Sequence, residues 1–305
     1  MTASALANAP YRDAALPIDQ RVADLVSRMT LEEKAAQMLC VWQQKGAKLL
    51  DEAGNFDLAK ARENFGQGHG LGQVGRPSDS GGGKNARDMA ALTNAIQQFF
   101  VDQSRLGIPV VFHEECLHGH AAVDATSFPQ PIGLGATFDP DLVRRLFAMT
   151  ALEARVRGTH QALTPVVDVA REPRWGRVEE TYGEDPYLVA QLGIAAIEGF
   201  QGDRTFRDKK SVVATLKHFA AHGQPESGTN CAPVNVSERL LREVFLYPFQ
   251  QAIHTASAMS VMASYNEIDG VPSHASRWLL GDVLRGEWRF TGFVVSDYFA
   301  IRELA

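Results

Sequence analysis

Short apolar runs alternate with helical patterns along most of the chain. The runs are bounded by turn residues and are rich in β-branched and aromatic side chains, which is typical of buried strands. Strands that alternate with helices at this spacing predict βα units and a parallel sheet. The strand candidates lie at residues 38–42, 72–75, 109–112, 162–169, 212–216, 258–263 and 292–296.

Helix boundaries are marked by capping residues. Thr30-Leu31-Glu32-Glu33 has the form of a capping box. Asp139-Pro140 and Asp185-Pro186 each combine an N-cap residue with proline at the first helical position. Gly158 is a helix stop and Ser237 a further cap. The predicted helices span residues 16–29, 30 onward, 88–105, 139–158, 185–200, 237–256 and 276–288, and the glycine-rich run at 78–84 is predicted to be a flexible loop.

The count of strands bears on the fold class. A closed (β/α)8 barrel needs eight strands and about 250 residues. The chain has 305 residues but only seven strand candidates. We therefore expect an α/β fold, a single TIM-like barrel domain over residues 1–305 that is incomplete at its C-terminal end.

Composition narrows the classes of partner. The chain is 45% hydrophobic and 22% charged, which is typical of a soluble globular enzyme. A net charge of −6 without a basic stripe argues against nucleic acid, and no apolar run is long enough for a membrane span. Cys40, Cys116 and Cys231 lie too far apart to suggest a disulfide framework or a zinc motif. The N-terminus lacks a signal peptide, which predicts a cytoplasmic protein, or a periplasmic or secreted one if a signal was removed.

Polar side chains cluster after successive strand candidates. Because the carboxyl ends of parallel strands meet on one face of a barrel, these clusters should form one hydrogen-bonding pocket. Carboxylates accept hydrogen bonds, and Arg, Lys and His donate them. A sugar hydroxyl can do both, so such a pocket suits a sugar. The clusters are 113–120, 171–177, 217–223, 264–266 and 296–298.

Several of these residues also have structural interpretations. His113, Glu114 and His118 follow an H-E-x-x-x-H spacing, which lacks the geometry of a helical zinc site. Trp175 fits a brace for a loop, and His222 fits a hydrogen-bonded loop histidine. Spacing alone allows Asp297 to be either a structural cap or a catalytic carboxylate. The acids Glu179, Glu180, Glu184 and Asp185 are expected in a solvated loop and a helix start.

An ordered series of motifs resembles glycoside hydrolase family 3, from Thr30-Leu31-Glu32-Glu33-Lys34 onward. Any single motif is weak, but six in the same order are specific. The motifs are Glu115-Cys-Leu-His-Gly119, Pro173-Arg-Trp-Gly-Arg177, Glu184-Asp185-Pro186, Lys217-His218-Phe219, Ser264-Tyr265-Asn266 and Ser296-Asp297-Tyr298.

The resemblance implies a TIM-like barrel and a retaining mechanism without a cofactor. Asp297 matches the family nucleophile, which forms a covalent glycosyl intermediate. Arg177, Lys217 and His218 match residues that hold sugar hydroxyls. Tyr265 matches a residue close to the nucleophile. Glu115 stands where many glucosidases of the family have Asp, and its extra methylene favours a pentose over a hexose.

The resemblance also implies a following α/β sandwich domain that carries the general acid/base, a Glu. In a branch that acts on N-acetylglucosaminides, an Asp–His pair after the Lys-His strand serves instead. Here residues 222–230 contain His222-Gly223 but no Asp-Ser-His. The expected activity is that of an exo-β-glycosidase, an O-glycosyl hydrolase that releases terminal xylosyl or glucosyl units from an oligosaccharide or glycoside partner.

Three points stay open. A β-N-acetylhexosaminidase that uses His222 as its acid and a non-catalytic sugar-binding module are the alternative functions. The sequence is also compatible with a homo-oligomer.

Overall fold

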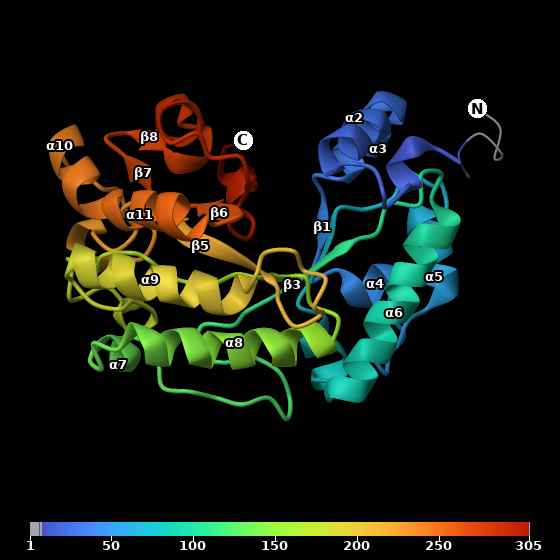
Figure 1. Cartoon of the computed structure of the whole chain (residues 1–305), viewed down its shortest axis with the longest axis horizontal. Helices are drawn as coiled ribbons and strands as arrows, with labels where there is room; N and C mark the ends of the chain where they lie inside the picture. Colours follow the sequence, from blue (N-terminus) through green and yellow to red (C-terminus); the bar gives the residue numbers. More distant parts are fainter. Residues whose placement is uncertain (1–5, 7, 305) are drawn as a thin grey trace. The chain divides into compact units, whose positions relative to one another are not determined.

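The computed structural model describes residue 6 and residues 8–304, and the chain forms two compact units (Figure 1). The first unit ends at His113 and the second begins at Glu114. Each unit has its own cluster of buried apolar side chains. The expected single TIM-like domain over residues 1–305 and the following sandwich domain stay predictions.

The first unit contains parallel strands in the order β1, β2, β3. These strands are β1 (Cys40–Val41), β2 (Gln73–Gly75) and β3 (Val111–Glu114), the last of which leads into the second unit. Phe99 and Phe100 pack edge to face in its core, with ring centroids 5.1 Å apart. Its helices are η1 (Pro10–Arg12), α2 (Ile18–Arg28), α3 (Leu31–Ala36), α4 (Lys45–Lys48), α5 (Leu58–Phe65), η2 (Pro77–Gly82) and α6 (Ala86–Gln103).

The second unit contains parallel strands in the order β4, β5, β6, β9. These strands are β4 (Gln161–Ala162), β5 (Val213–Phe219), β6 (Ser260–Ala263) and β9 (Phe293–Val295). Strand β7 (Glu267–Ile268) and strand β8 (Val271–Pro272) form a separate hairpin. The helices are α7 (Pro131–Gly135), α8 (Pro140–Val156), η3 (Val178–Glu180), α9 (Pro186–Gln201), η4 (Glu226–Gly228), α10 (Glu238–Leu240), η5 (Leu241–Phe245), α11 (Tyr247–Ala256), η6 (Ser273–Ala275), η7 (Trp278–Glu287) and η8 (Ala300–Leu304).

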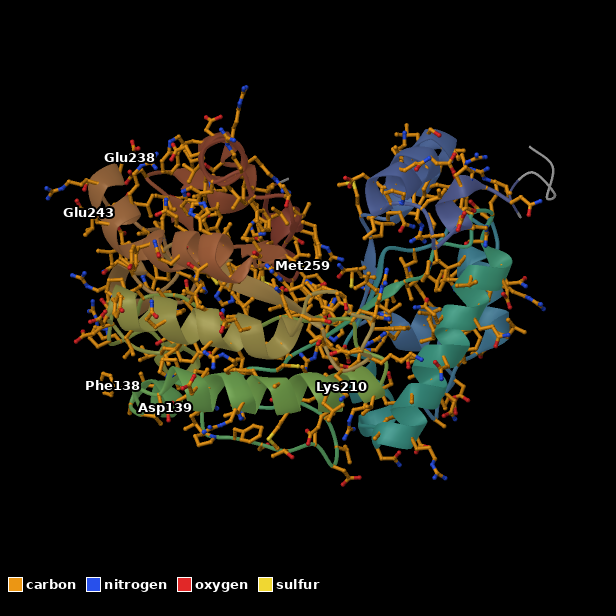
Figure 2. The ribbon with its side chains drawn as sticks, viewed as in Figure 1. Phe138, Asp139, Lys210, Glu238, Glu243 and Met259 are labelled. Carbon is orange, nitrogen blue, oxygen red and sulfur yellow. The ribbon has the colours of Figure 1, made fainter. Side chains whose placement is uncertain are left out.

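The predicted alternation of parallel strands and helices is therefore confirmed, and so are the main helix starts. Asp139, at the start of α8 in Figure 2, accepts a hydrogen bond from the Leu142 N–H at 2.9 Å. Asp185 accepts from Tyr187 and Leu188 at the start of α9. The Thr30 capping box is formed at α3. Each cap satisfies N–H groups that a helix leaves without an internal partner.

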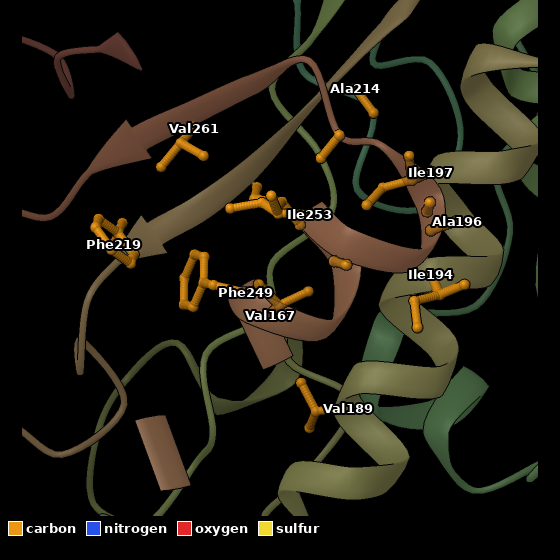
Figure 3. Close-up of a cluster of buried hydrophobic side chains, with 14 of the residues drawn as sticks. Val167, Val189, Ile194, Ala196, Ile197, Ala214, Phe219, Phe249, Ile253 and Val261 are labelled. Carbon is orange, nitrogen blue, oxygen red and sulfur yellow. The ribbon is translucent and has the colours of Figure 1, made fainter. Parts of the chain in front are cut away.

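Helices α8, α9 and α11 pack side by side and supply much of the second unit's core (Figure 1). Phe147 of α8 and Phe200 of α9 are fully buried, with ring centroids 4.8 Å apart. Phe249 of α11 packs edge to face on Phe219 at the end of β5 (Figure 3). This contact ties the carboxyl end of β5, where polar residues begin, to a rigid apolar layer.

The strand predicted at residues 162–169 is wrong in its length. Only Gln161 and Ala162 form β4. Pro165 has no N–H to donate, so the regular ladder is interrupted there. Pairing resumes in isolation, where the Val167 N–H donates to the Lys217 carbonyl at 2.8 Å.

The strand predicted at 212–216 is longer than expected, because β5 runs from Val213 to Phe219. Lys217 and His218 therefore belong to the strand itself instead of the loop after it. The Lys217 N–H still donates to the Pro165 carbonyl, at 3.1 Å. A strand fixes its backbone more firmly than a loop, so both side chains start from a well-defined position.

Two further predictions need correction, and one element was not predicted. Residues 78–84 are not an open flexible loop, since η2 covers most of them with Ser78 and Ser80 buried. The single helix expected at 237–256 is instead α10, the π-helical η5 and α11, with Pro248 in the first turn of α11. The β7–β8 hairpin was not predicted. Asp269-Gly270 was its signal, because both residues have the positive φ that a tight hairpin turn needs.

We expect Phe147→Ala to lower the free energy of unfolding by about 3–5 kcal/mol, because it leaves a cavity against Phe200. Met149→Ala on the same helix is the matched control, since Met149 is 54% exposed. The control should change the free energy by less than about 0.5 kcal/mol. Urea unfolding of both variants tests this, and equal losses would contradict the assignment of the core.

Candidate active site

All the predicted site residues lie in the second unit, at or after the carboxyl ends of strands. Glu115 follows β3, Lys217 and His218 lie within β5, and Tyr265 and Asp297 follow β6 and β9. Lys210 and Met259, labelled in Figure 2, precede the amino ends of β5 and β6. The polar groups are therefore at the end of the sheet where parallel α/β folds place their ligands.

Asp297 is buried and has one carboxylate oxygen free. Its N–H donates to Nε2 of His274 at 3.2 Å, and its Oδ1 accepts from the Tyr298 N–H at 2.7 Å. Within the described residues, Oδ2 has no hydrogen-bond partner. Burial raises the pKa of Asp297, and the opposing charge of Lys217 limits the rise. An unshared lone pair on a buried carboxylate suits attack on an electrophilic carbon.

Tyr265 stands beside this carboxylate. Its hydroxyl donates to the Tyr298 carbonyl at 2.8 Å. Burial and the negative charge of Asp297 raise the pKa of the phenol well above its usual range. The phenol therefore stays protonated, and the predicted closeness of Tyr265 to Asp297 agrees with the structure.

Lys217 and Glu115 form an ion pair, with Nζ and Oε2 3.0 Å apart. The Lys217 side chain is buried, whereas that of Glu115 is partly exposed. One of the three ammonium protons is used in this bond, which leaves two for other acceptors. The pair places a donor and an acceptor side by side, as a sugar hydroxyl requires.

Arg177 links most of the remaining groups. Its Nε and Nη2 donate to the two oxygens of Glu180 at 2.7 and 2.8 Å. Nη2 also lies 3.0 Å from Nε2 of His218, and Nη1 lies 3.1 Å from Nε2 of His222. Burial opposes the charge of Arg177, but the Glu180 carboxylate outweighs it and raises the pKa. Four of the five guanidinium N–H groups are thus engaged.

Sequence reasoning missed Asp168, which is buried behind His218. Its Oδ2 accepts from the His218 N–H at 3.1 Å and from Nδ1 at 2.7 Å. Burial raises the pKa of Asp168 to about 7. The available signal was an acid within the otherwise apolar run 162–169.

The prediction that Glu180 lies in a solvated loop is wrong. Its side chain is only 17% exposed and holds Arg177 with both oxygens. The short 3-10 turn η3 places Glu180 three residues from Arg177, on the same side. Glu179 next to it is exposed, as predicted.

The structural interpretation of Trp175 agrees with its contacts, whereas that of His222 holds only in part, because Nδ1 of His222 has no hydrogen-bond partner among the described residues. Trp175 is buried, donates from Nε1 to Asn230 at 2.9 Å and meets the His222 ring edge to face. His222 is fully buried, and burial lowers its pKa to about 3. It is therefore neutral at physiological pH.

Within residue 6 and residues 8–304, no cluster of three or more His, Cys, Asp or Glu side chains has the arrangement of a metal site. No helix in the same part of the chain has the length and apolar character needed to cross a bilayer.

Comparison with known proteins identifies the family. Residues 30–305 match the model of the glycosyl hydrolase family 3 N terminal domain. A periplasmic β-glucosidase of Salmonella typhimurium is 34% identical over 94% of this chain and 34% of its own length. A β-xylosidase of Formosa agariphila is 44% identical over 63% of this chain and 28% of its own length.

Solved structures agree with the family match. A β-glucosidase from Erythrobacter marinus superposes with a TM-score of 0.87 and 40% identity, covering 98% of this chain and 38% of that one. A β-glucosidase from Listeria innocua in complex with glucose superposes with a TM-score of 0.79 and 36% identity. The match covers 93% of this chain and 38% of that one. The chain belongs to glycoside hydrolase family 3, a family of glycosyl hydrolases, and the predicted α/β TIM-like fold is confirmed. The chain spans less than two fifths of the length of each of these four proteins.

Removing Glu180 should destabilise the protein, because Arg177 would keep its charge in a largely buried position without its carboxylate. We expect Glu180→Ala to lower the free energy of unfolding by about 2 kcal/mol. Glu179→Ala, one residue away and exposed, is the control and should change it by less than about 0.5 kcal/mol. Denaturant unfolding at neutral pH measures both. Identical unfolding midpoints for the two variants would show that the Arg177–Glu180 ion pair does not stabilise the fold.

Proposed function

We propose that the protein is a retaining exo-β-glycosidase that hydrolyses terminal non-reducing β-D-xylosyl or β-D-glucosyl residues from oligosaccharides. The observation that carries this proposal is the buried Asp297, whose Oδ2 is without a partner among the described residues. The names of the relatives, β-xylosidase and β-glucosidase, support the two sugars.

In the proposed reaction, Oδ2 of Asp297 attacks the anomeric carbon as the glycosidic C–O bond breaks. The leaving oxygen takes a proton from a general acid, and a covalent glycosyl–Asp297 ester forms. Water, deprotonated by the same group, then displaces Asp297 and releases the sugar with its original configuration. We propose that this acid/base is a Glu on a following domain, as the resemblance implies.

The sugar would be held by the groups around the nucleophile. Lys217 has two protons and Arg177 one N–H to donate, while Glu115 accepts. His218 has its Nε2 3.7 Å from Oδ2 of Asp297, which places it against the reacting end of the sugar. Charged donors and acceptors at these positions favour a polyhydroxylated ring over an apolar ligand.

The environment of His222 argues against the N-acetylhexosaminidase alternative. A general acid must carry a proton at the working pH. His222 is fully buried, its pKa is lowered to about 3, and its Nε2 faces the Arg177 guanidinium. A non-catalytic sugar-binding module would have no use for the desolvated carboxylate at position 297.

Asp297→Asn should reduce kcat on aryl β-xylosides and aryl β-glucosides by about 10⁴-fold, because an amide is not a nucleophile. The fold should be kept, since an amide oxygen can still accept from the Tyr298 N–H. Azide should restore turnover of an activated aryl glycoside and give the α-glycosyl azide. Asp282→Asn, an exposed acid in the same unit, should be fully active. An active Asp297→Asn variant would refute the assignment.

Glu115→Asp should shift the preference from xylosides towards glucosides. The shorter side chain withdraws the carboxylate by one methylene and leaves room for a hydroxymethyl group. We expect the ratio of kcat/KM for aryl glucoside over aryl xyloside to rise about tenfold. An unchanged ratio would show that Glu115 does not set the sugar preference.

A further inference from the structure

The contacts of His218 fix the position of its ring proton. A guanidinium has only donors, so Nε2 of His218, 3.0 Å from Nη2 of Arg177, must be the acceptor. The other ring nitrogen, Nδ1, lies 2.7 Å from Oδ2 of Asp168 and must therefore carry the proton. Both contacts require the same neutral tautomer.

The charges around the ring favour this state. Burial, together with the charges of Arg177 and Lys217, holds the pKa of His218 well below its usual range. Asp168 and Asp297 are the acids nearest the ring. The two acids lie at opposite ring nitrogens, so they compete for the one imidazole proton.

The outcome of that competition matters for the nucleophile. Nε2 of His218 is 3.7 Å from Oδ2 of Asp297, the oxygen without a described partner. A proton on Nε2 would point a donor at that oxygen and tie up the lone pair that attacks the sugar. A proton on Nδ1 leaves the lone pair available.

We propose that Asp168 is a positioning residue that holds the ring proton of His218 on Nδ1 and so keeps Oδ2 of Asp297 free for attack. The inference rests on the proposed role of Asp297 as nucleophile. It assigns a function to a carboxylate that is costly to bury, since Oδ1 of Asp168 has no described hydrogen-bond partner. A residue kept only for stability would serve better as an apolar side chain.

The tautomer can be measured directly by 15N NMR of histidine-labelled protein, with His218→Gln used to assign the resonance. We expect the wild-type ring to show a protonated Nδ1 and an unprotonated Nε2 at pH 8, where Asp168 is ionised. A protonated Nε2 in the wild-type protein would overturn the proposal without any variant. This measurement does not depend on turnover, so it stands apart from the test of Asp297.

Two substitutions separate positioning from packing. Asp168→Ala leaves the buried Nδ1–H without an acceptor, so the proton should move to Nε2, where Asp297 can accept it and the contact with Nη2 of Arg177 is lost. We expect kcat/KM to fall by about 10³-fold, an effect of the kind seen when a catalytic histidine adopts the wrong tautomer. Asp168→Asn keeps an oxygen that can accept from Nδ1, so the tautomer should persist and the loss should stay within about tenfold. Asp282→Ala is the control and should retain full activity and the wild-type tautomer.

Equal losses in the Ala and Asn variants, with the tautomer unchanged in both, would contradict the proposal and leave Asp168 a structural acid. If Asp168→Ala does not fold, the wild-type spectrum and the Asp168→Asn variant still test whether Asp168 positions the ring proton. If Asp168→Ala inverts the tautomer while Asp297→Asn remains active, the proposed nucleophile is wrong although the tautomer assignment is right.

Discussion

The partly buried guanidinium of Arg177 is the group on which the candidate site depends. A single Arg side chain contacts Glu180, His218 and His222, and because it can only donate, it favours an unprotonated Nε2 on both histidines. Its charge would be costly in this position without Glu180. The electrostatics of the site therefore follow from one cation whose partners come from a short 3-10 turn, a strand and a loop.

The fold supplies the rigidity that this arrangement needs. Lys217 and His218 lie in β5, and Phe219, the next residue, packs on Phe249 of α11. Asp297 follows β9, which pairs with β6. Groups that are a few ångströms apart in the site are thus fixed by strands whose order is set by the apolar core, which leaves little freedom to the polar side chains.

The sequence alone predicts those features that depend on the positions of strands and on short motifs. The parallel strands, the caps at Asp139 and Asp185, and the placement of Glu115, Arg177, Lys217, His218, Tyr265 and Asp297 follow from apolar runs, capping residues and the polar residues that succeed them. Asp168 could not be found in this way, because its role depends on a contact with His218, fifty positions later in the chain. Glu180 was misjudged because an acidic run has the composition of a solvated loop, and only the η3 turn separates it from Glu179. The length of β4 depends on Pro165, which lacks the N–H that a longer ladder would need.

The central claim is that the free oxygen of Asp297 becomes covalently bonded to the sugar. The most direct measurement is to incubate the complete protein with an activated 2-fluoro-β-xyloside or 2-fluoro-β-glucoside, digest it and map the modified peptide by tandem mass spectrometry. The account predicts one 2-fluoroglycosyl group on the peptide that contains Ser296-Asp297-Tyr298, with Asp297 as the labelled residue. A label on any other carboxylate, or complete inactivation without a label on Asp297, would contradict it.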